Sequence, residues 1–248
     1  MSQSIEKHRQ LEETMFRAWP AHEALDYDGW VLRFADGYTK RANSVNPHFG
    51  SSLPLHGKIA HCESAYHERG LPTIFRLTPF SQPANLDTTL EELGYEVLDP
   101  TLVMTCSLKH SLEDGVDPTL IVSADRWFAA FDHLHKCTVF QSSAHRRIVE
   151  SFDGLRCFVA ISVNDEVCAC GLGTHVDGSI GLFDLFTHES FRGQGHGSAI
   201  ARAILRWGRR HGATSGFLQV HSQNTPAHRL YERFGFTVAY PYSYRIKR

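Results

Sequence analysis

The chain has 248 residues, enough for two medium domains or one large one, and 42% are hydrophobic and 21% charged, as in an ordinary globular protein. Its 25 Lys and Arg residues nearly balance 27 Asp and Glu residues, so the formal net charge of −2 offers no basic surface for nucleic acid. The apolar stretches are far shorter than a membrane span, and the N-terminus lacks a signal-peptide pattern. We therefore expect a cytoplasmic protein whose partners include neither nucleic acid nor membrane.

The first half of the chain alternates helical and β-rich patterns. An amphipathic helix is predicted over 4–19, followed by a hairpin of strands 30–34 and 38–45 around the turn Asp36-Gly37. The next predicted elements are a helix over 55–68, a strand over 73–77, a helix over 86–93 and strands over 95–97 and 101–108. Residues 111–117 are the expected linker between two domains, 1–110 and 118–248.

The second half starts with an apolar run at 120–123. Helices are predicted over 124–135 and 142–152, the second with a Ser-Ser N-cap. Strands over 157–163 and 166–175 form a predicted hairpin, and a strand at 182–187 follows. A helix over 196–210, a strand over 217–220, a second helix and two last strands complete the pattern.

Parts of the two halves resemble each other. From Gly70 to Gly94 is 24 positions and from Gly212 to Gly235 is 23, with similar residues around each pair of glycines. This similarity indicates an internal repeat of a strand-helix-strand unit. Leu90 in the first half stands where Tyr231 stands in the second.

A glycine-rich turn joins the strand at 182–187 to the helix that follows it. The spacing Arg192-x-x-Gly195-x-Gly197 places flexible backbone at a helix N-terminus, where free N–H groups and the helix dipole favour a phosphate or pyrophosphate. A dinucleotide-binding fingerprint would need glycine where the chain has Ser198, and a P-loop Gly-Lys-Ser/Thr is absent. Taken alone, the turn also fits a helix start that binds nothing.

A second pattern begins 27 residues beyond Gly197 and reads Asn224-x-x-Ala-x-x-Leu-Tyr231-x-x-x-Gly235-Phe. Together, the two motifs resemble the signatures of the GCN5-related N-acetyltransferases. The resemblance covers residues from about 118 to the end and part of the first half. It implies an α+β fold in three layers, with a mixed, mostly antiparallel central sheet flanked by helices, built as two tandem halves of which the first is degenerate.

The resemblance also implies acetyl-CoA as co-substrate. In that family the tyrosine matching Tyr231 gives a hydrogen bond or proton to the departing CoA thiolate, and a phenol of pKa about 10 stays protonated at neutral pH. A helix-face aromatic packed in the core is the competing interpretation of Tyr231. The other implied cofactor contacts are Phe186, Thr187, His188, Arg192, Gly193, Gln194, Gly195, His196, Gly197, Ser198 and Asn224.

The catalytic base is not marked by a motif. Family members that acetylate protein N-termini carry a glutamate twelve residues before the tyrosine, where this chain has Gln219. Asp184 and His221 are the candidate bases, because an aspartate in an apolar strand needs a partner or a function and histidine titrates near neutral pH. Each fits a structural role equally well, and a water chain or an acylated Cys168 or Cys170 are the alternatives.

Trp30, Arg33, Arg41 and Asn43 are candidate acceptor-binding residues, because polar and aromatic groups on the first-half hairpin would face the seam between domains. A solvated strand face is an equally good interpretation of these four residues. The sequence predicts transfer of an acetyl group to a small-molecule or amino-acid-like amine. A protein lysine, another acyl donor or a non-catalytic acyl-CoA sensor are the alternatives, and the chain fits a monomer or a homodimer.

No metal is expected. The chain has neither a C-x-x-C pair nor an H-E-x-x-H motif, although it contains 16 histidines. Its six scattered cysteines fit free thiols, and they are residues 62, 106, 137, 157, 168 and 170.

Overall fold

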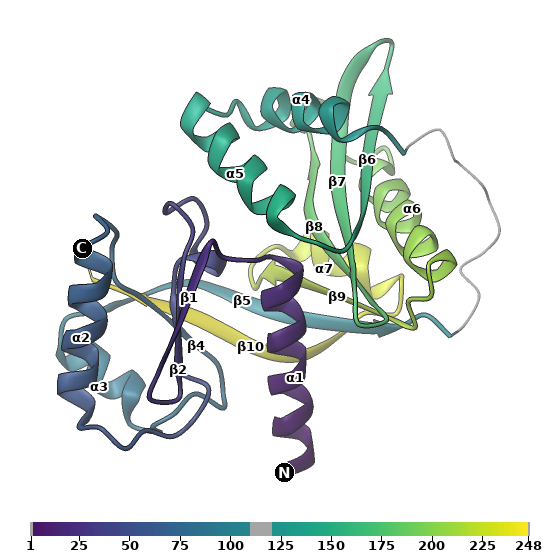
Figure 1. Cartoon of the computed structure of the whole chain (residues 1–248). Coiled ribbons are helices and arrows are strands. Elements are labelled where there is room, and N and C mark those ends of the chain that lie inside the picture. The colour runs from purple at the N-terminus through teal and green to yellow at the C-terminus, as the bar shows by residue number, and fades with distance from the viewer. Residues whose placement is uncertain (1, 110–120, 248) are drawn as a thin grey trace.

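A computed structural model describes residues 2–109 and 121–247, which form two lobes around one continuous sheet (Figure 1). The first half contains α1 (Ser2–Ala18), β1 (Glu23–Tyr27), β2 (Trp30–Phe34), the 3-10 turn η1 (Lys40–Ala42), β3 (Val45–Asn46), α2 (Leu55–His67), β4 (Ile74–Leu77), α3 (Leu86–Glu92) and β5 (Glu96–Ser107). The second half contains α4 (Ala124–His135), α5 (Val139–Ser151), β6 (Leu155–Val163), β7 (Glu166–Val176), β8 (Ser179–Thr187), the 3-10 turn η3 (Glu189–Phe191), α6 (His196–Arg210), β9 (Ser215–His221), α7 (Thr225–Glu232) and β10 (Thr237–Ile246). The expected linker, 111–117, and Leu120 lie outside the described residues.

The strand order is β1-β2-β3-β4-β10-β5-β9-β8-β7-β6. Strands β3 and β4, and likewise β8 and β9, pair in parallel, whereas the other neighbouring strands are antiparallel. Each strand of the first half mirrors its counterpart in the second half about an axis between β10 and β5. This order confirms the expected α+β class with a mixed, mostly antiparallel sheet.

The two halves exchange their last strands. β5 leaves the first half and pairs with β9 of the second, from Thr101 opposite His221 to Ser107 opposite Ser215. β10 returns and pairs with β4 on one side and with β5 on the other. The halves therefore share main-chain hydrogen bonds at the centre of the sheet, where Figure 1 shows β5 and β10 running between the lobes.

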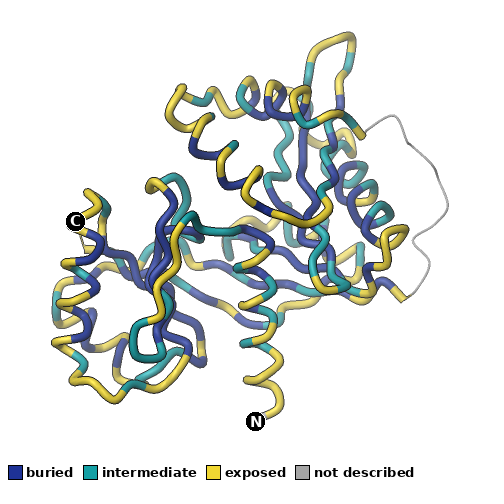
Figure 2. Tube along the Cα trace, in the orientation of Figure 1, coloured by how far each residue is buried: buried dark blue, intermediate teal, exposed yellow. Residues whose placement is uncertain are grey.

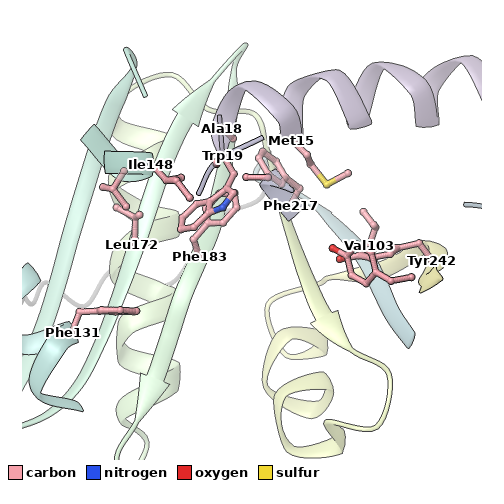
Figure 3. Close-up of a cluster of buried hydrophobic side chains, with 14 of the residues drawn as sticks. Met15, Ala18, Trp19, Val103, Phe131, Ile148, Leu172, Phe183, Phe217 and Tyr242 are labelled. Atoms are coloured by element: carbon pink, nitrogen blue, oxygen red, sulfur yellow. The ribbon is translucent and has the colours of Figure 1, made fainter. Parts of the chain in front are cut away.

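The buried side chains form one core in each lobe and one between the lobes. The shared core includes Met15 and Trp19 of α1, Trp127 of α4 and Phe183 of β8. Figure 3 shows Trp19 beside Phe183, and their stacked rings lie 5.1 Å apart. The first turns of α1 are exposed and its last turns are covered (Figure 2), so the helix ends against the second half of the chain.

Several predicted elements need correction. The first hairpin turns at Asp28-Gly29, where both residues have positive φ, and joins β1 to β2. Residues 38–44 form no strand, because the Asn43 side chain bonds to the backbone of Ala35, Gly37 and Thr39 and folds this segment into a loop, and only Val45 of the predicted strand belongs to β3.

Other predicted boundaries also shift. α5 starts at Val139 rather than 142, because Thr138 and Gln141 form a capping box. The predicted strands 95–97 and 101–108 are one long strand, β5. The two strands expected after the last helix are one, β10, because the neighbouring position in the sheet belongs to β5. At 120–123 the described residues make a single bridge, Ile121 to Val159.

A buried ion pair fixes α1 to the sheet. Arg76 of β4 donates to Glu12, and Tyr240 of β10 donates to the same carboxylate with its hydroxyl 2.6 Å away. Glu12 is fully buried and His48 Nε2 lies 3.7 Å from it. Burial alone would raise the pKa of Glu12, but the charge of Arg76 and the hydrogen bonds from Arg76 and Tyr240 outweigh burial and lower it.

We expect Glu12→Gln to destabilise the protein by about 3–5 kcal/mol, because it leaves a buried guanidinium without its counter-charge. Exposed Glu13 on the same helix is the matched control, and Glu13→Gln should change the free energy of unfolding by less than about 0.5 kcal/mol. Because folding lowers the pKa of Glu12, its contribution is complete above the pKa of the unfolded chain and is lost as pH falls through the folded-state pKa. Urea titrations at several pH values measure both effects, and equal losses in the two variants would contradict this assignment.

Candidate functional site

The site is built where the parallel strands β8 and β9 separate. They pair only from Ser179 opposite Ser215 to Leu182 opposite Leu218, although β8 continues to Thr187 and β9 to His221. β9 keeps its partner β5 to its end, while the edge of β8 that faces β9 is unpaired beyond Leu182 among the described residues. This V-shaped opening leaves the last residues of β8 without a strand partner on the side of β9, so backbone groups on this edge are available to a ligand.

A β-bulge interrupts β8 inside this opening. Phe183 pairs with Leu172 and Phe186 with Cys170, so Asp184 and Leu185 oppose one residue of β7. Asp184 has φ of 53°, a left-handed conformation that aspartate tolerates better than most residues. A bulge re-aims side chains, and here it turns Asp184 toward α5.

The glycine-rich turn follows β8 directly. Gly193 and Gly195 have φ of 77° and 88°, and Gly195 is the N-cap of α6, so glycine is required there by conformation. Arg192 Nε donates to the carbonyl of Thr187 at 3.2 Å, which folds the turn back on the strand end. A Cβ on Gly197 would lie 3.0 Å from Leu230 of α7, so its small size lets the two helices meet closely.

The structure thus brings most of the predicted cofactor contacts together at one end of the opening. Phe186 and Thr187 end β8, and the rest form the following turn and the first turn of α6: His188, Arg192, Gly193, Gln194, Gly195, His196, Gly197 and Ser198.

The second motif forms α7. The side chain of Asn224 accepts a hydrogen bond from Ala227 N at 3.2 Å and so caps the helix. Tyr231 is 9% exposed, and burial raises its pKa to about 12. Its hydroxyl has no hydrogen-bond partner among the described residues, so it stays protonated at neutral pH with a donor to give.

Asp184 is held by a residue that carried no sequence signal. His145 of α5 is fully buried, and its Nε2 lies 2.9 Å from Asp184 Oδ2. The Asp184 side chain remains 12% exposed, so one face of the carboxylate is open. Five aromatic rings lie within about 6 Å of the His145 ring and restrict it, namely those of Trp19, Tyr38, Trp127, Phe128 and Phe131.

The other base candidate and Gln219 have different surroundings. His221 Nδ1 accepts a hydrogen bond from Gln223 N at 3.3 Å, which leaves the proton of a neutral ring on Nε2. Gln219 accepts from the Tyr242 hydroxyl at 2.6 Å and donates to the sulfur of Met15, so its amide is engaged on both sides. Of the two predicted bases, Asp184 has the geometry that suits proton removal.

Three of the four predicted acceptor residues have structural partners instead. Trp30 is fully buried and its indole donates to Gln82 O at 2.9 Å. Arg33 is 3% exposed and donates to three backbone carbonyls, while Asn43 holds the loop described above. Arg41 differs, because it is half-buried over the rings of Trp19 and Phe183 at 4.9 and 5.6 Å.

Comparison with known proteins identifies the family of this chain. A family model described as "Probable histone acetyltransferase Rv0428c C-terminal" matches residues 6–245. The chain belongs to this family. The uncharacterized N-acetyltransferase YobR of Bacillus subtilis (strain 168) is 28% identical over 246 residues, which are 97% of this chain and 98% of YobR.

Solved structures agree on the fold. A GCN5-related N-acetyltransferase from Kribbella flavida aligns with a TM-score of 0.71 at 14% identity, over 96% of this chain and 94% of that one. A tandem GNAT protein from the clavulanic acid biosynthesis pathway aligns with a TM-score of 0.59 at 13% identity, over 77% and 69%. The chain therefore has the fold of the GCN5-related N-acetyltransferases, and together with the acetyltransferase family model this confirms the resemblance inferred from its two motifs.

Acyl transfer through a cysteine thiol finds little support in this N-acetyltransferase. Burial raises the pKa of the Cys170 thiol, and the Asp184 carboxylate raises it further; burial also raises the pKa of Cys168. Both thiols are then protonated at neutral pH and poor nucleophiles. Within residues 2–109 and 121–247, no three His, Cys, Asp or Glu side chains gather as metal ligands, and no helix is long and apolar enough to span a bilayer.

The first half of the acetyltransferase has closed the equivalent turn. Its α2 corresponds to α6, but Pro54 with φ of −58° is the N-cap where α6 has Gly195. The Asp28 carboxylate accepts hydrogen bonds from Ser52 N at 3.0 Å and Leu53 N at 3.0 Å and from neighbouring hydroxyls. These hydrogen bonds lower the pKa of Asp28 well below its usual range, so a carboxylate anion already occupies the backbone N–H groups that precede α2.

We expect a glycine-to-alanine substitution to affect stability differently in the turn before α6 and in the first turn of α2. Gly195→Ala should lower stability by about 1–2 kcal/mol, because alanine resists positive φ although its Cβ would meet no atom within 4 Å. Gly57→Ala, in the first turn of α2, should leave stability unchanged or raise it, because that glycine is exposed and helical. Urea denaturation of the two variants measures the contrast, and a loss in Gly57→Ala as large as that in Gly195→Ala would contradict it.

Proposed function

We propose that this enzyme transfers the acetyl group of acetyl-CoA directly to the amine of a small-molecule acceptor, with both substrates bound together. The observation that carries the proposal is the V-shaped opening of β8 and β9, which ends at an N-terminal helix turn with two left-handed glycines. An extended chain that ends in a pyrophosphate matches this shape, because the strand edge can pair with amides and the helix start can bind the phosphates. CoA has that form.

On the donor side, the unpaired edge at Phe186 and Thr187 would bind the pantetheine arm. The backbone N–H groups from Gly193 to Ser198 would bind the pyrophosphate, supported by the dipole of α6. Asn224 shapes this side by capping α7, which carries Tyr231. The phenol would then donate its proton to the CoA sulfur as the thioester bond breaks, since its raised pKa keeps it protonated.

On the acceptor side, Asp184 is the base in this proposal. An alkylamine arrives mainly as an ammonium ion, because its pKa lies near 10, and a carboxylate attracts it and removes its proton. His145 occupies one carboxylate oxygen at 2.9 Å and leaves the other for the substrate. The free amine then attacks the thioester carbonyl with no covalent enzyme intermediate, and positioning supplies much of the rate. As the C–S bond breaks, the nitrogen releases its second proton, which through solvent restores the proton that Tyr231 gives to the sulfur, so the net proton released is the one taken by Asp184.

A lysine side chain of a protein is the second candidate acceptor, favoured by the histone-related description of the family. It would reach Asp184 by the same route and undergo the same chemistry. A monomer or a homodimer is compatible with this scheme, because both halves of one chain already contribute rings around His145, the partner of Asp184.

Acetyl-CoA should raise the thermal midpoint of the wild-type protein by several degrees. At a hundred times its dissociation constant, a ligand stabilises the folded state by about 2.7 kcal/mol. The double variant Gly195→Val/Gly197→Val should lose this shift, whereas Gly57→Val should keep it. Differential scanning fluorimetry tests all three proteins, and a wild type that does not respond to saturating acetyl-CoA would overturn the donor assignment.

Asp184→Asn should lower kcat/KM for an acceptor amine by about 10²–10⁴ at pH 7, because an amide cannot take the proton. The deficit should shrink as pH rises toward 10, where more of the amine is already free. His221→Gln is the comparison and should stay within about threefold of wild type. Thiol release from acetyl-CoA measures the rates, and a larger loss in the His221 variant would move the role of base to His221.

A further inference from the structure

A small cavity between the halves carries an excess of positive charge. Its volume is about 10 Å³, room for a single water molecule, and its lining includes three guanidinium groups but one carboxylate. The charged and polar members are Glu12, Arg33, Arg41, Arg76 and Gln219. His48 beside Glu12 adds no positive charge at neutral pH, because burial lowers its pKa to about 4.

The three arginines differ in how well they are satisfied. Arg33 gives its donors to backbone carbonyls, as described above, and is buried. Arg76 is paired with Glu12, but its Nη2 is buried and has no hydrogen-bond partner among the described residues. The Arg41 guanidinium is half-buried and makes neither an ion pair nor a hydrogen bond with any residue in the described ranges. A partly exposed guanidinium whose five donors have no protein partner can bind a planar anion.

Arg41 also lies close to the base proposed above. Trp19, whose ring Arg41 covers, is 5.9 Å from the ring of His145, and His145 holds Asp184. Tyr38 lies within electrostatic reach of both groups: burial raises its pKa, the charge of Asp184 raises it further, and the charge of Arg41 lowers it. The Asp184 carboxylate and the Arg41 guanidinium, which have opposite charges, thus both lie near the aromatic side chains of Trp19 and Tyr38.

A phosphate of CoA is a poor match for Arg41. The guanidinium lies over Phe183, which precedes the bulge of β8, whereas the glycine turn starts beyond Thr187. At about 3.3 Å per residue, the strand alone separates Phe183 from Thr187 by about 13 Å. Arg41 is therefore on the far side of Asp184 from the proposed phosphate turn.

We propose that the acceptor is an amine that also carries a carboxylate, with its amine at Asp184 and its carboxylate on the guanidinium of Arg41. This inference rests on the proposed function and narrows its acceptor to amino-acid-like compounds. The aromatic rings of Trp19 and Tyr38 form the walls between the two charged ends.

The test is a matched set of acceptors. Each common L-amino acid is compared with its decarboxylated amine and its primary amide, by thiol release from acetyl-CoA, with rates expressed per concentration of free amine. For each amino acid that the enzyme acetylates, kcat/KM of the acid should exceed kcat/KM of its amine and of its amide by about tenfold to a hundredfold. Arg41→Met should remove this preference, and kcat/KM for the amine and for the amide should stay within about twofold of the wild-type values.

Two control variants complete the experiment. Arg210→Met, at the exposed end of α6, should keep the full preference, and Arg41→Lys should retain part of it, since a lysine is a point charge without the planar fork. If Arg41→Met does not fold, the comparison of the three compounds in the wild type and in Arg41→Lys still tests whether Arg41 binds the carboxylate.

Several results would overturn the inference. One such result is a kcat/KM for the acid that is no higher than that for its amine and its amide. Another is an equal loss of kcat/KM for all three compounds in Arg41→Met. Preference for a lysine side chain in a peptide, or acetyl-CoA stabilisation without acetylation of any acid, would refute this acceptor class while leaving the donor site in place. If acetyl-CoA neither stabilises the protein nor is consumed, the proposed function itself fails.

Discussion

The exchange of β5 and β10 is the constraint on which the rest of the structure depends. Because β9 pairs with β5 along the whole length of β9, it has a fixed partner on one side and can separate from β8 on the other. The same exchange holds the lobes in one sheet, which lets α1 of the first half end against β8. An opening for the donor and a wall for the acceptor thus follow from one topological feature, fixed by main-chain hydrogen bonds of both halves.

Local patterns in the sequence predicted most of the elements, because helix and strand periodicity depends on neighbours in the chain. They did not predict which strands pair. Two Asp-Gly turns stand eight residues apart, at Asp28 and Asp36, and both have left-handed backbones. Only the packing of β3 and the side chain of Asn43 decides which of them closes a hairpin. The sequence does not reveal the strand exchange either, because the residue pattern of β10 would be the same whether it paired within its own half or with the first half.

The glycine turn before α6, the proposed donor side, could be predicted from sequence because its geometry is set by glycines a few residues apart. The acceptor side could not, because it joins residues far apart in the chain. His145 meets Asp184 only through the packing of α5 on β8, and nothing in the helix pattern marks it. Arg33 and Arg41 looked alike in the sequence, yet one is saturated by carbonyls and the other is unpaired among the described residues.

The two halves show how one framework can be divided between two tasks. Both place a turn before a helix at the same point, but α6 keeps Gly195 where α2 has Pro54, and Asp28 supplies the first half with its own anion. A CoA phosphate at α2 would have to displace a carboxylate held by several hydrogen bonds, so the proposed function has a single donor site, in the second half. In the same proposal the first half contributes to the acceptor side, with α1, whose Trp19 stacks on Phe183 of the second half, and with the loop that carries Arg41. Duplication would then supply a binding wall to the half that carries the proposed chemistry.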